Sequence, residues 1–410
     1  MHQGVVLNAH RNLLAAAITL GLLAACSKAP DPAPAAPATT PEAVPAPAPA
    51  APAADATATP PARTDAFDIA QVTRFDSPWA MTFLPDGRML VTEMAGTLHL
   101  YDPASDTRGS IVGVPEVAHV AQGGLGDIVL HPRFAENQVV YLSFAEREGD
   151  LLGSAVARAR LALDDSGTGS LDDLQVIWRQ VPKKSGDGHF GYRIAFDGDG
   201  KLWISSSERK EFDPAQDMAS NLGKIVRLND DGSVPADNPF ADQDEVAAQV
   251  WSLGHRNILG LAFDGDGRLW AHEMGPMGGD ELNLIQRGAN YGYPLVSNGD
   301  HYDGTPIPDH ETRPEFNAPV ITWTPVISPA GFMIYDGESF ADWRGSGFIG
   351  GMSSKSLVRI QFDGDSAREA ERFDMGRRIR EVEQGPDGAI WLLEDGTRQG
   401  GGWLLKLTPR

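Results

Sequence analysis

Short apolar runs separated by turns of Asp and Gly recur along the chain from residue 83 onward. Four segments share one pattern, an apolar strand end followed by an Asp-Gly turn and a strand of β-forming residues: Phe83–Val91, Phe196–Ile204, Phe263–Ala271 and Gln384–Leu392. Two weaker copies occupy 130–141 and 334–348. Asp-Gly tolerates the positive φ that tight hairpins require. The pattern therefore predicts six β-hairpins.

The number and spacing of these hairpins predict the fold. Six copies over residues 67–410 give roughly 57 residues per unit, close to a four-stranded propeller blade with long loops. Helical periodicity is scarce in this region. We therefore expect an all-β domain, a six-bladed β-propeller with four-stranded antiparallel blades, since a seventh or eighth copy is not found. A strand near 67–72 should complete the last blade beside 403–407 and close the ring.

The first 66 residues differ from the rest in composition. An apolar run at 13–24 is too short to span a bilayer and matches a secretory signal. Its Leu-Ala-Ala-Cys ending resembles the signal of bacterial lipoproteins, whose cysteine becomes the lipidated first residue; a plain signal peptide with a chance cysteine is the alternative. We expect a signal peptide at 1–25, then a lipidated Cys26 and a Pro/Ala-rich disordered linker over 26–66. Ser27, where an aspartate would retain the protein at the inner membrane, favours an outer-membrane lipoprotein facing the periplasm or the cell surface.

Charge and cysteine content exclude some classes of protein. The formal net charge is −22 at pH 7. This charge argues against binding of nucleic acid through its phosphates and against a basic membrane patch, so membrane contact is expected through the lipid alone. Cys26 is the only cysteine. Once it carries lipid, the domain can form neither a disulfide nor a thiolate metal site.

One loop histidine is a candidate catalytic base. His189 precedes Arg193 by four residues, in a Gly-containing segment that leads into a strand. Loops on a rigid scaffold often carry catalytic groups, and the pKa of histidine suits proton abstraction near neutral pH. A surface or structural histidine is the alternative on this segment alone.

Basic residues in the segments between strands are candidates for an anion site. They are Arg256, Lys355, Arg378 and Arg380. Positions 378 and 380 project to the same side if the chain is extended there. Because propeller loops gather at one face, the four cations would converge in an otherwise acidic protein. The alternative is that each pairs with a nearby acid.

Seven short motifs, each weak alone, follow one another between Ser77 and the C-terminus. They are Gln122–Gly126, His189 with Arg193, Leu222–Leu228, Gly254–Asn257, Glu273–Glu281, Asn290–Gly292 and Arg378–Val382. Together they resemble the soluble glucose and aldose sugar dehydrogenases that depend on pyrroloquinoline quinone (PQQ). The fold of that family is a six-bladed propeller, which agrees with the repeat count.

The resemblance implies binding sites for PQQ and calcium. The positions that match cofactor-binding residues of the family are Gln122, Arg256, Asn257, Lys355, Arg378 and Arg380. PQQ bears three carboxylates, and arginine forks suit carboxylates well. Backbone carbonyls that match Gly275 and Pro276 hold a Ca²⁺ at the cofactor, and calcium accepts carbonyl oxygens readily. Glu281 and the Tyr291 carbonyl match a second, structural Ca²⁺ site in some members.

The resemblance also implies the reaction. The residue matching His189 removes the proton of the sugar C1 hydroxyl while a hydride passes from C1 to PQQ. The metal and the residue matching Arg256 stabilise the negative charge that develops, and the sugar leaves as a lactone. Arg193 is expected to orient the His189 loop. Two departures from the family pattern, Tyr192 and Met277, bear on substrate choice, while 323–328 has no assigned role.

Two other functions use the same scaffold. A calcium-dependent lactone hydrolase would use carboxylates in the central channel and need no cationic cluster, and a non-catalytic binding propeller would lack the family's catalytic residues. For the dehydrogenase, the expected partners are an aldose and an electron acceptor, a quinone or a cytochrome. The sequence leaves open whether the protein is a monomer or a homodimer.

Overall fold

The structure is a computed structural model that describes residues 65–164, 167–398 and 400–410. The segment with the expected signal peptide and Cys26, and nearly all of the expected linker, lies outside the described residues. Within the described ranges, none of the helices is long and apolar enough to cross a membrane.

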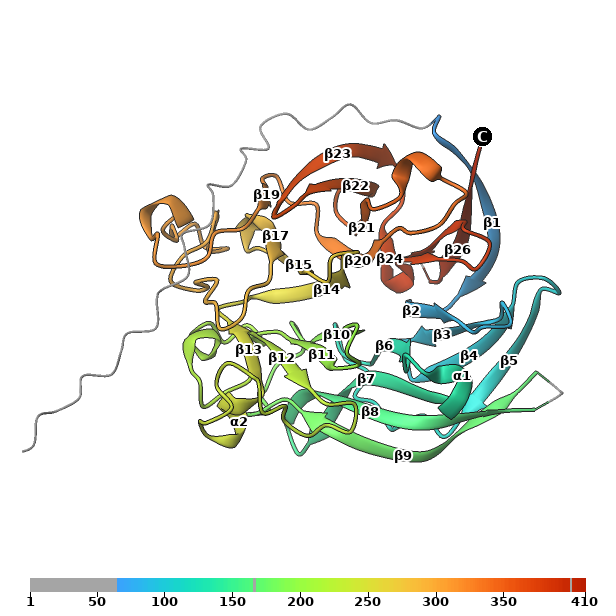
Figure 1. Cartoon of the computed structure of the whole chain (residues 1–410), viewed down its shortest axis with the longest axis horizontal. Coiled ribbons are helices and arrows are strands. Elements are labelled where there is room, and N and C mark those ends of the chain that lie inside the picture. Colours follow the sequence, from blue (N-terminus) through green and yellow to red (C-terminus); the bar gives the residue numbers. More distant parts are fainter. Residues whose placement is uncertain (1–64, 165–166, 399) are drawn as a thin grey trace, which may run out of the picture. The chain divides into compact units, whose positions relative to one another are not determined.

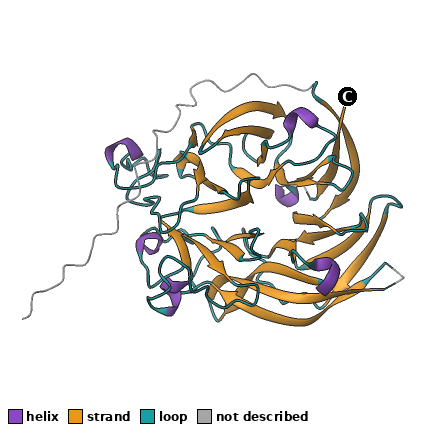
Figure 2. Cartoon of the chain, in the orientation of Figure 1, coloured by secondary structure: helices purple, strands orange, loops and turns teal. Residues whose placement is uncertain are grey.

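Four-stranded antiparallel blades follow one another along the chain and surround a common centre (Figures 1 and 2). The first three blades contain β2 (Pro78–Phe83), β3 (Met89–Glu93), β4 (Thr97–Asp102) and β5 (Thr107–Val112); β6 (Leu125–Leu130), β7 (Val139–Glu148), β8 (Leu151–Leu163) and β9 (Gly169–Arg179); β10 (Gly191–Phe196), β11 (Leu202–Ser206), β12 (Lys224–Leu228) and β13 (Val250–Leu253). The last three contain β14 (Asn257–Phe263), β15 (Leu269–Met274), β17 (Asp280–Leu284) and β19 (Ile321–Trp323); β20 (Pro329–Ile334), β21 (Gly347–Gly351), β22 (Ser356–Asp363) and β23 (Ser366–Asp374); β24 (Ile379–Gln384), β25 (Ile390–Glu394), β26 (Gly402–Pro409) and β1 (Phe67–Phe75). The six blades confirm the predicted propeller.

The remaining elements are short. They are α1 (Phe134–Asn137), α2 (Glu245–Ala248), the 3₁₀ turns η1 (Asp213–Gln216), η2 (His310–Thr312), η3 (Ala341–Trp343) and η4 (Gly396–Arg398), and the paired strands β16 (Met277–Gly278) and β18 (Gly299–Asp300). A short parallel pairing of β5 with β9 joins the first two blades into one sheet.

The first strand closes the ring as predicted. β1 pairs antiparallel with β26, from Phe67 opposite Pro409 to Phe75 opposite Gly402. The last blade therefore combines strands from both ends of the described chain.

The six repeats coincide with the turn between the first two strands of each blade. In the third blade, Asp197 Oδ1 accepts the Lys201 amide at 2.8 Å and Oδ2 accepts the Trp203 indole N–H at 2.9 Å. In the fourth blade, Asp264 accepts the Trp270 indole at 3.0 Å. One aspartate thus stabilises the turn and fixes a core tryptophan, which explains why the sequence pattern recurs.

The first strands of the blades contact one another around the centre, and Arg193 on β10 ties them together. Its Nε donates to the Leu259 carbonyl at 2.8 Å, and its terminal nitrogens lie 3.5 Å from Asp127 and 2.6 Å from Glu381. Its guanidinium lies 4.2 Å from the centre of the Trp79 ring. One buried arginine therefore links first strands from five of the six blades.

The segments that precede the first strands meet at one face of the ring. Gln122 precedes β6, His189 precedes β10, Arg256 precedes β14 and Arg378 precedes β24. Since adjacent strands within a blade run antiparallel, the ends of the second strands and the turns that follow them lie at the same face. This face carries the candidate site.

Candidate active site

A cavity of ≈ 620 Å³ opens among the first strands and receives four of the six residues predicted to bind a cofactor. They are Gln122, Asn257, Arg378 and Arg380. The volume lies in the range typical of small-molecule sites. The structure thus brings together residues that are up to 258 positions apart in the sequence.

Arg378 and Arg380 face the same side, as predicted, because both bind Asp395. Arg378 Nε lies 2.7 Å from Asp395 Oδ2, and Arg380 Nη2 lies 3.2 Å from Oδ1. Burial alone would raise the pKa of Asp395, but the charges of Arg380 and Arg378 hold it below its ordinary value. Two cations share one carboxylate, so the group keeps a net positive charge beside the cavity. The alternative, in which each cation pairs with its own surface acid, therefore holds only in that both arginines pair with an acid; they share one buried carboxylate.

Several polar atoms at this site are buried without a partner. They are Nε of Arg380 and Oδ1 of Asn257, which line the cavity, and Nε of Arg256, the residue next to Asn257. An unsatisfied buried polar atom costs about 1–3 kcal/mol, so a ligand that supplies both acceptors and donors would be stabilised here. A quinone with several carboxylates has that chemistry. The residues present therefore fit PQQ.

Lys355 lies apart from the cavity wall. It is exposed, has φ 54°, and sits in the turn between β21 and β22. Met352 and Ser353 of the same turn do line the cavity. The lysine thus follows two residues that line the cavity but does not itself line it.

A second cavity of ≈ 530 Å³ contains the predicted catalytic residues His189 and Arg256. Pro276, a predicted metal ligand, also lines it. Tyr302 lines both cavities, so the two adjoin. Four residues predicted to bind the cofactor and the two predicted catalytic residues therefore line neighbouring cavities.

His189 is held in one tautomer by Glu208, a residue that sequence reasoning missed. Its Nδ1 lies 2.5 Å from Glu208 Oε1, and its backbone N–H donates to Gln122 Oε1 at 2.8 Å. An ionised carboxylate only accepts hydrogen bonds, so Nδ1 carries the proton and Nε2 keeps its lone pair. Burial lowers the pKa of His189, although Glu208 opposes this shift. The imidazole is therefore neutral and able to accept a proton at pH 7.

The loop that carries His189 is oriented by Arg209, and the role predicted for Arg193 was wrong. Arg209 Nε and Nη2 donate to the carbonyls of Gly188 and Gly186 at 2.8 and 2.7 Å. Its guanidinium stacks 3.9 Å from the centre of the Phe190 ring. Arg193 instead binds Leu259, Asp127 and Glu381 on the first strands of three other blades.

Arg256 is almost fully buried and is held by hydrogen bonds from both its backbone and its side chain. Its backbone N–H donates to Glu273 Oε2 at 2.5 Å, and its Nη1 donates to the carbonyls of Met274 and Gly275 at 2.7 and 2.6 Å. The carbonyl of Gly275, predicted to bind Ca²⁺, thus accepts a hydrogen bond from the Arg256 guanidinium. Pro276 follows directly on the cavity wall.

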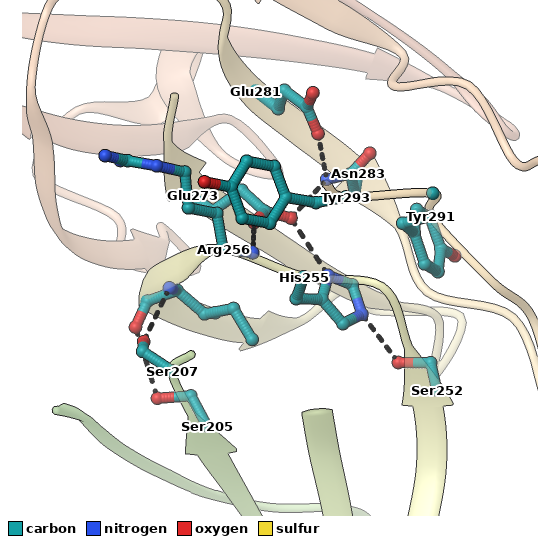
Figure 3. A network of polar contacts seen from close by, with 12 residues as sticks. Ser205, Ser207, Ser252, His255, Arg256, Glu273, Glu281, Asn283, Tyr291 and Tyr293 are labelled. Atoms are coloured by element: carbon teal, nitrogen blue, oxygen red, sulfur yellow. Dashed lines mark hydrogen bonds and ion pairs between the residues drawn. The ribbon is translucent and has the colours of Figure 1, made fainter. Parts of the chain in front are cut away.

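The predicted structural metal site contains two buried carboxylates that lie close together, those of Glu273 and Glu281 (Figure 3). Asn283 Nδ2 donates to both Glu273 and Glu281 at 3.1 Å, and Asn283 Oδ1 has no partner. Burial and the charge of Glu273 raise the pKa of Glu281 well above its ordinary value. The Tyr291 carbonyl lies 3.1 Å from His310 Nε2. An unpartnered oxygen beside two carboxylates fits a cation, although the described residues hold no group of three His, Cys, Asp or Glu arranged as metal ligands.

Comparison with known proteins gives the site its context. The family model for glucose/sorbosone dehydrogenases matches residues 75–406. The chain belongs to the glucose/sorbosone dehydrogenase family. It is accordingly an oxidoreductase of the sugar dehydrogenase class, as the motifs predicted.

Members of the glucose/sorbosone dehydrogenase family resemble this chain along most of its length. Aldose sugar dehydrogenase YliI of Escherichia coli K12 is 39% identical over 346 residues, which cover 82% of this chain and 91% of YliI. The crystal structure of soluble aldose sugar dehydrogenase from E. coli in its apo form has a TM-score of 0.78 at 37% identity and covers 84% of this chain and 100% of that one. The PQQ-bound aldose sugar dehydrogenase of Streptomyces coelicolor has a TM-score of 0.69 at 28% identity and covers 86% of this chain and all (100%) of that one.

Proposed function

We propose that this dehydrogenase uses PQQ and Ca²⁺ to oxidise the C1 hydroxyl of aldoses to the lactone. The observation that carries the proposal is the adjacency of the two cavities. One contains His189, with Nδ1 bound to Glu208, and Arg256. The other is lined by Arg378, Arg380 and Asn257, and the buried Arg380 Nε and Asn257 Oδ1 have no hydrogen-bond partner. A PQQ-bound relative supports the choice of cofactor.

The residues of the chain have distinct roles in this reaction. Nε2 of His189 accepts the C1 hydroxyl proton, and the carboxylate of Glu208 stabilises the resulting imidazolium. Arg256 stabilises negative charge at the reacting centre because its guanidinium is buried and fixed. When bound, PQQ supplies the hydride acceptor and Ca²⁺ supplies a Lewis acid. The sugar loses one hydride and one proton and departs as a lactone.

The remaining site residues would hold the cofactor and the metals. Arg378, Arg380 and Lys355 would bind the PQQ carboxylates, with Gln122 and Asn257 supplying hydrogen bonds. Calcium at the cofactor would use the carbonyls of Gly275 and Pro276, and the structural calcium would use Glu281 and the Tyr291 carbonyl. These last assignments rest on the fit of the donor sets described above.

The hydrolase alternative receives less support from the channel. A lactone hydrolase would use channel carboxylates to hold calcium, but Asp127 and Glu381 are directed at the guanidinium of Arg193. The cationic cluster and the His189–Glu208 pair have no role in that chemistry. A non-catalytic binding propeller would not need His189 and Arg256 together in one cavity, so their presence there argues against that alternative.

The cellular setting follows from the leader sequence. Cys26 would carry the lipid that tethers the enzyme to the outer membrane, and the Pro/Ala-rich segment would set the propeller off the surface. Electrons would pass to a quinone or a cytochrome, and the protein would act as a monomer or a homodimer.

Reconstitution tests the proposed function. The purified chain is mixed with PQQ and Ca²⁺ and assayed for reduction of an artificial dye with a panel of aldoses. We expect reduction that requires both PQQ and an aldose. Failure to reduce the dye with any sugar, while PQQ binding is verified by its absorbance, would overturn the proposal.

A further inference from the structure

A groove of ≈ 700 Å³ lies at the face of the propeller opposite the candidate active site. Residues of the β10–β11 turn in the third blade and of the β14–β15 turn in the fourth line it. The segments of the active site precede the first strands of the blades, whereas these turns follow the first strands, so the two regions lie at opposite ends of the same strands. In the described chain, the groove and the two active-site cavities have separate sets of lining residues.

Aromatic rings form the apolar part of the groove. Trp203 on β11 and Phe263 at the end of β14 pack edge to face between the two blades, with ring centres 5.5 Å apart. Trp251 on β13 packs on Trp203 in the same manner at 4.8 Å. Trp203 is buried, while Trp251 and Phe263 are partly exposed. Two aromatic side chains are thus accessible from the groove.

Two buried N–H groups at the groove lack an acceptor. Arg227 is 6% exposed, and its terminal nitrogens donate to Asp237 and Asn238, which do not line the groove. Its Nε has no hydrogen-bond partner among the described residues and lies 3.9 Å from Asp197 Oδ2, on the side of the groove. Nε1 of Trp251, whose ring centre lies 5.2 Å from the guanidinium carbon, is unpartnered as well. Because unmet buried donors cost free energy, a ligand with acceptor oxygens would be stabilised here.

Carboxylates in the groove set the opposite requirement. Asp199 on the β10–β11 turn and Asp365 on the β22–β23 turn line the groove and are exposed. Arg268, which also lines it, is already bound by Asp264 and Asp266 at 2.7 Å. Ionised carboxylates only accept hydrogen bonds, and they repel anions. The groove therefore favours a neutral ligand that donates hydrogen bonds as well as accepting them.

A saccharide combines these properties. Each hydroxyl both donates and accepts hydrogen bonds, and the C–H groups on the face of a pyranose are apolar and pack favourably on aromatic rings. We propose that the groove is a second, non-catalytic binding site for a neutral oligosaccharide. Trp251 and Phe263 contact the sugar face, Arg227 Nε and Trp251 Nε1 donate to sugar oxygens, and Asp199 accepts from a hydroxyl. The site does not depend on the proposed function, and an oligosaccharide held there leaves the active site accessible.

Calorimetry with sugars that cannot be oxidised at C1 tests the site. The alditols of maltohexaose, cellohexaose and xylohexaose are titrated into the full chain loaded with PQQ and Ca²⁺. We expect the wild type to bind at least one of them. Trp251→Ala, which removes both a ring and a donor, should raise the Kd of that alditol about 5-fold or more. Trp251→Phe, which loses only the N–H, should raise it about 3-fold.

Trp403→Ala is the matched control. Trp403 is a partly exposed tryptophan of the sixth blade that does not line the groove, so this variant should keep the wild-type Kd. Absence of binding of all three alditols to the wild type overturns the site. An unchanged Kd in Trp251→Ala overturns it too, and Trp251→Phe decides in the same way where the alanine variant does not fold.

Competition in the dehydrogenase assay shows at which face the sugar binds. Trp251→Ala should oxidise glucose with the wild-type kcat and KM, because Trp251 lies outside both active-site cavities. Saturating amounts of the bound alditol should leave the KM of the wild type for glucose unchanged. Competitive inhibition by the alditol would place it in the active site and overturn the proposal. A wild type without dehydrogenase activity contradicts the proposed function, and the calorimetric comparison still decides the groove.

Discussion

Glu208 accepts a hydrogen bond from Nδ1 of His189 across 2.5 Å, and this contact joins the end of the second strand of a blade to the segment before its first strand. The relationship recurs. In the fourth blade Glu273 binds His255 at 2.9 Å, and in the sixth Asp395 binds Arg378 at 2.7 Å. At three positions on one face of the propeller, an acidic residue from the second strand of a blade, or just after it, thus contacts a basic residue that precedes the first strand.

Replacing the carboxylate of Glu208 should impair the base without removing it. We expect Glu208→Gln to lower kcat by about 10- to 100-fold, because the amide neither fixes the Nδ1–H tautomer nor stabilises the imidazolium. The measurement is dye reduction at saturating PQQ. Glu211→Gln, on the same loop but paired with Lys184 at the surface, is the control and should keep kcat.

The pH dependence should report the environment of His189. Burial lowers its pKa from the ordinary 6.5. A lowered pKa keeps the imidazole neutral to lower pH, so activity should be present at pH 7 and be lost as pH falls through a value below 6.5. A profile of kcat/KM against pH checks this. An acidic limb centred above 6.5 would contradict the assignment.

Loss of a cavity arginine should weaken cofactor binding. Arg380→Ala removes a cation whose Nε lacks a partner and should raise the Kd for PQQ by about 10-fold or more, as expected for a charge-assisted contact. Fluorescence titration of PQQ measures the change. Arg377→Ala is a matched control, because Arg377 pairs with Glu394 and does not line the cavity. Equal effects of the two substitutions would exclude a specific clamp.

The central arginine should matter for stability more than for chemistry. Arg193→Met leaves the buried Asp127 and Glu381 without their cation and should lower the free energy of unfolding by about 3–5 kcal/mol. Burial already raises the pKa of Glu381 to about 7. Both acids become neutral as pH falls, so the loss should shrink at acidic pH. Denaturant unfolding at pH 8 and pH 5 measures both effects, and a loss that is independent of pH would argue against an ionic role.

Much of the fold could be predicted because its signal is local. An Asp-Gly turn flanked by apolar strands specifies a hairpin wherever it occurs, and four clear copies of this pattern with two weaker ones give the number of blades. The pairing of Phe67 with Pro409 was also predictable, since an unpaired edge must be closed. The parallel pairing of β5 with β9 had no local signal, because it arises from the length of the β8–β9 hairpin.

The candidate site was only partly predictable. The motifs gave His189 and Arg256, but Glu208 and Asp395 were missed even though each follows the second strand of a blade. Counting residues outward from the turn between β10 and β11, along both strands, would place Glu208 near His189. The irregular register between Gly191 and Ile194 shifts this count. Arg193 was misplaced because its partners come from four other blades, which no local pattern encodes.

The central claim is that His189 is the base in sugar oxidation, and single-turnover reduction of bound PQQ by an aldose tests it most directly. His189→Ala is compared with the wild type in a stopped-flow experiment, after titration has shown equal PQQ occupancy. We predict that the variant binds PQQ normally and reduces it at least about 100-fold more slowly. Reduction at the wild-type rate by a fully loaded His189→Ala enzyme would contradict the claim.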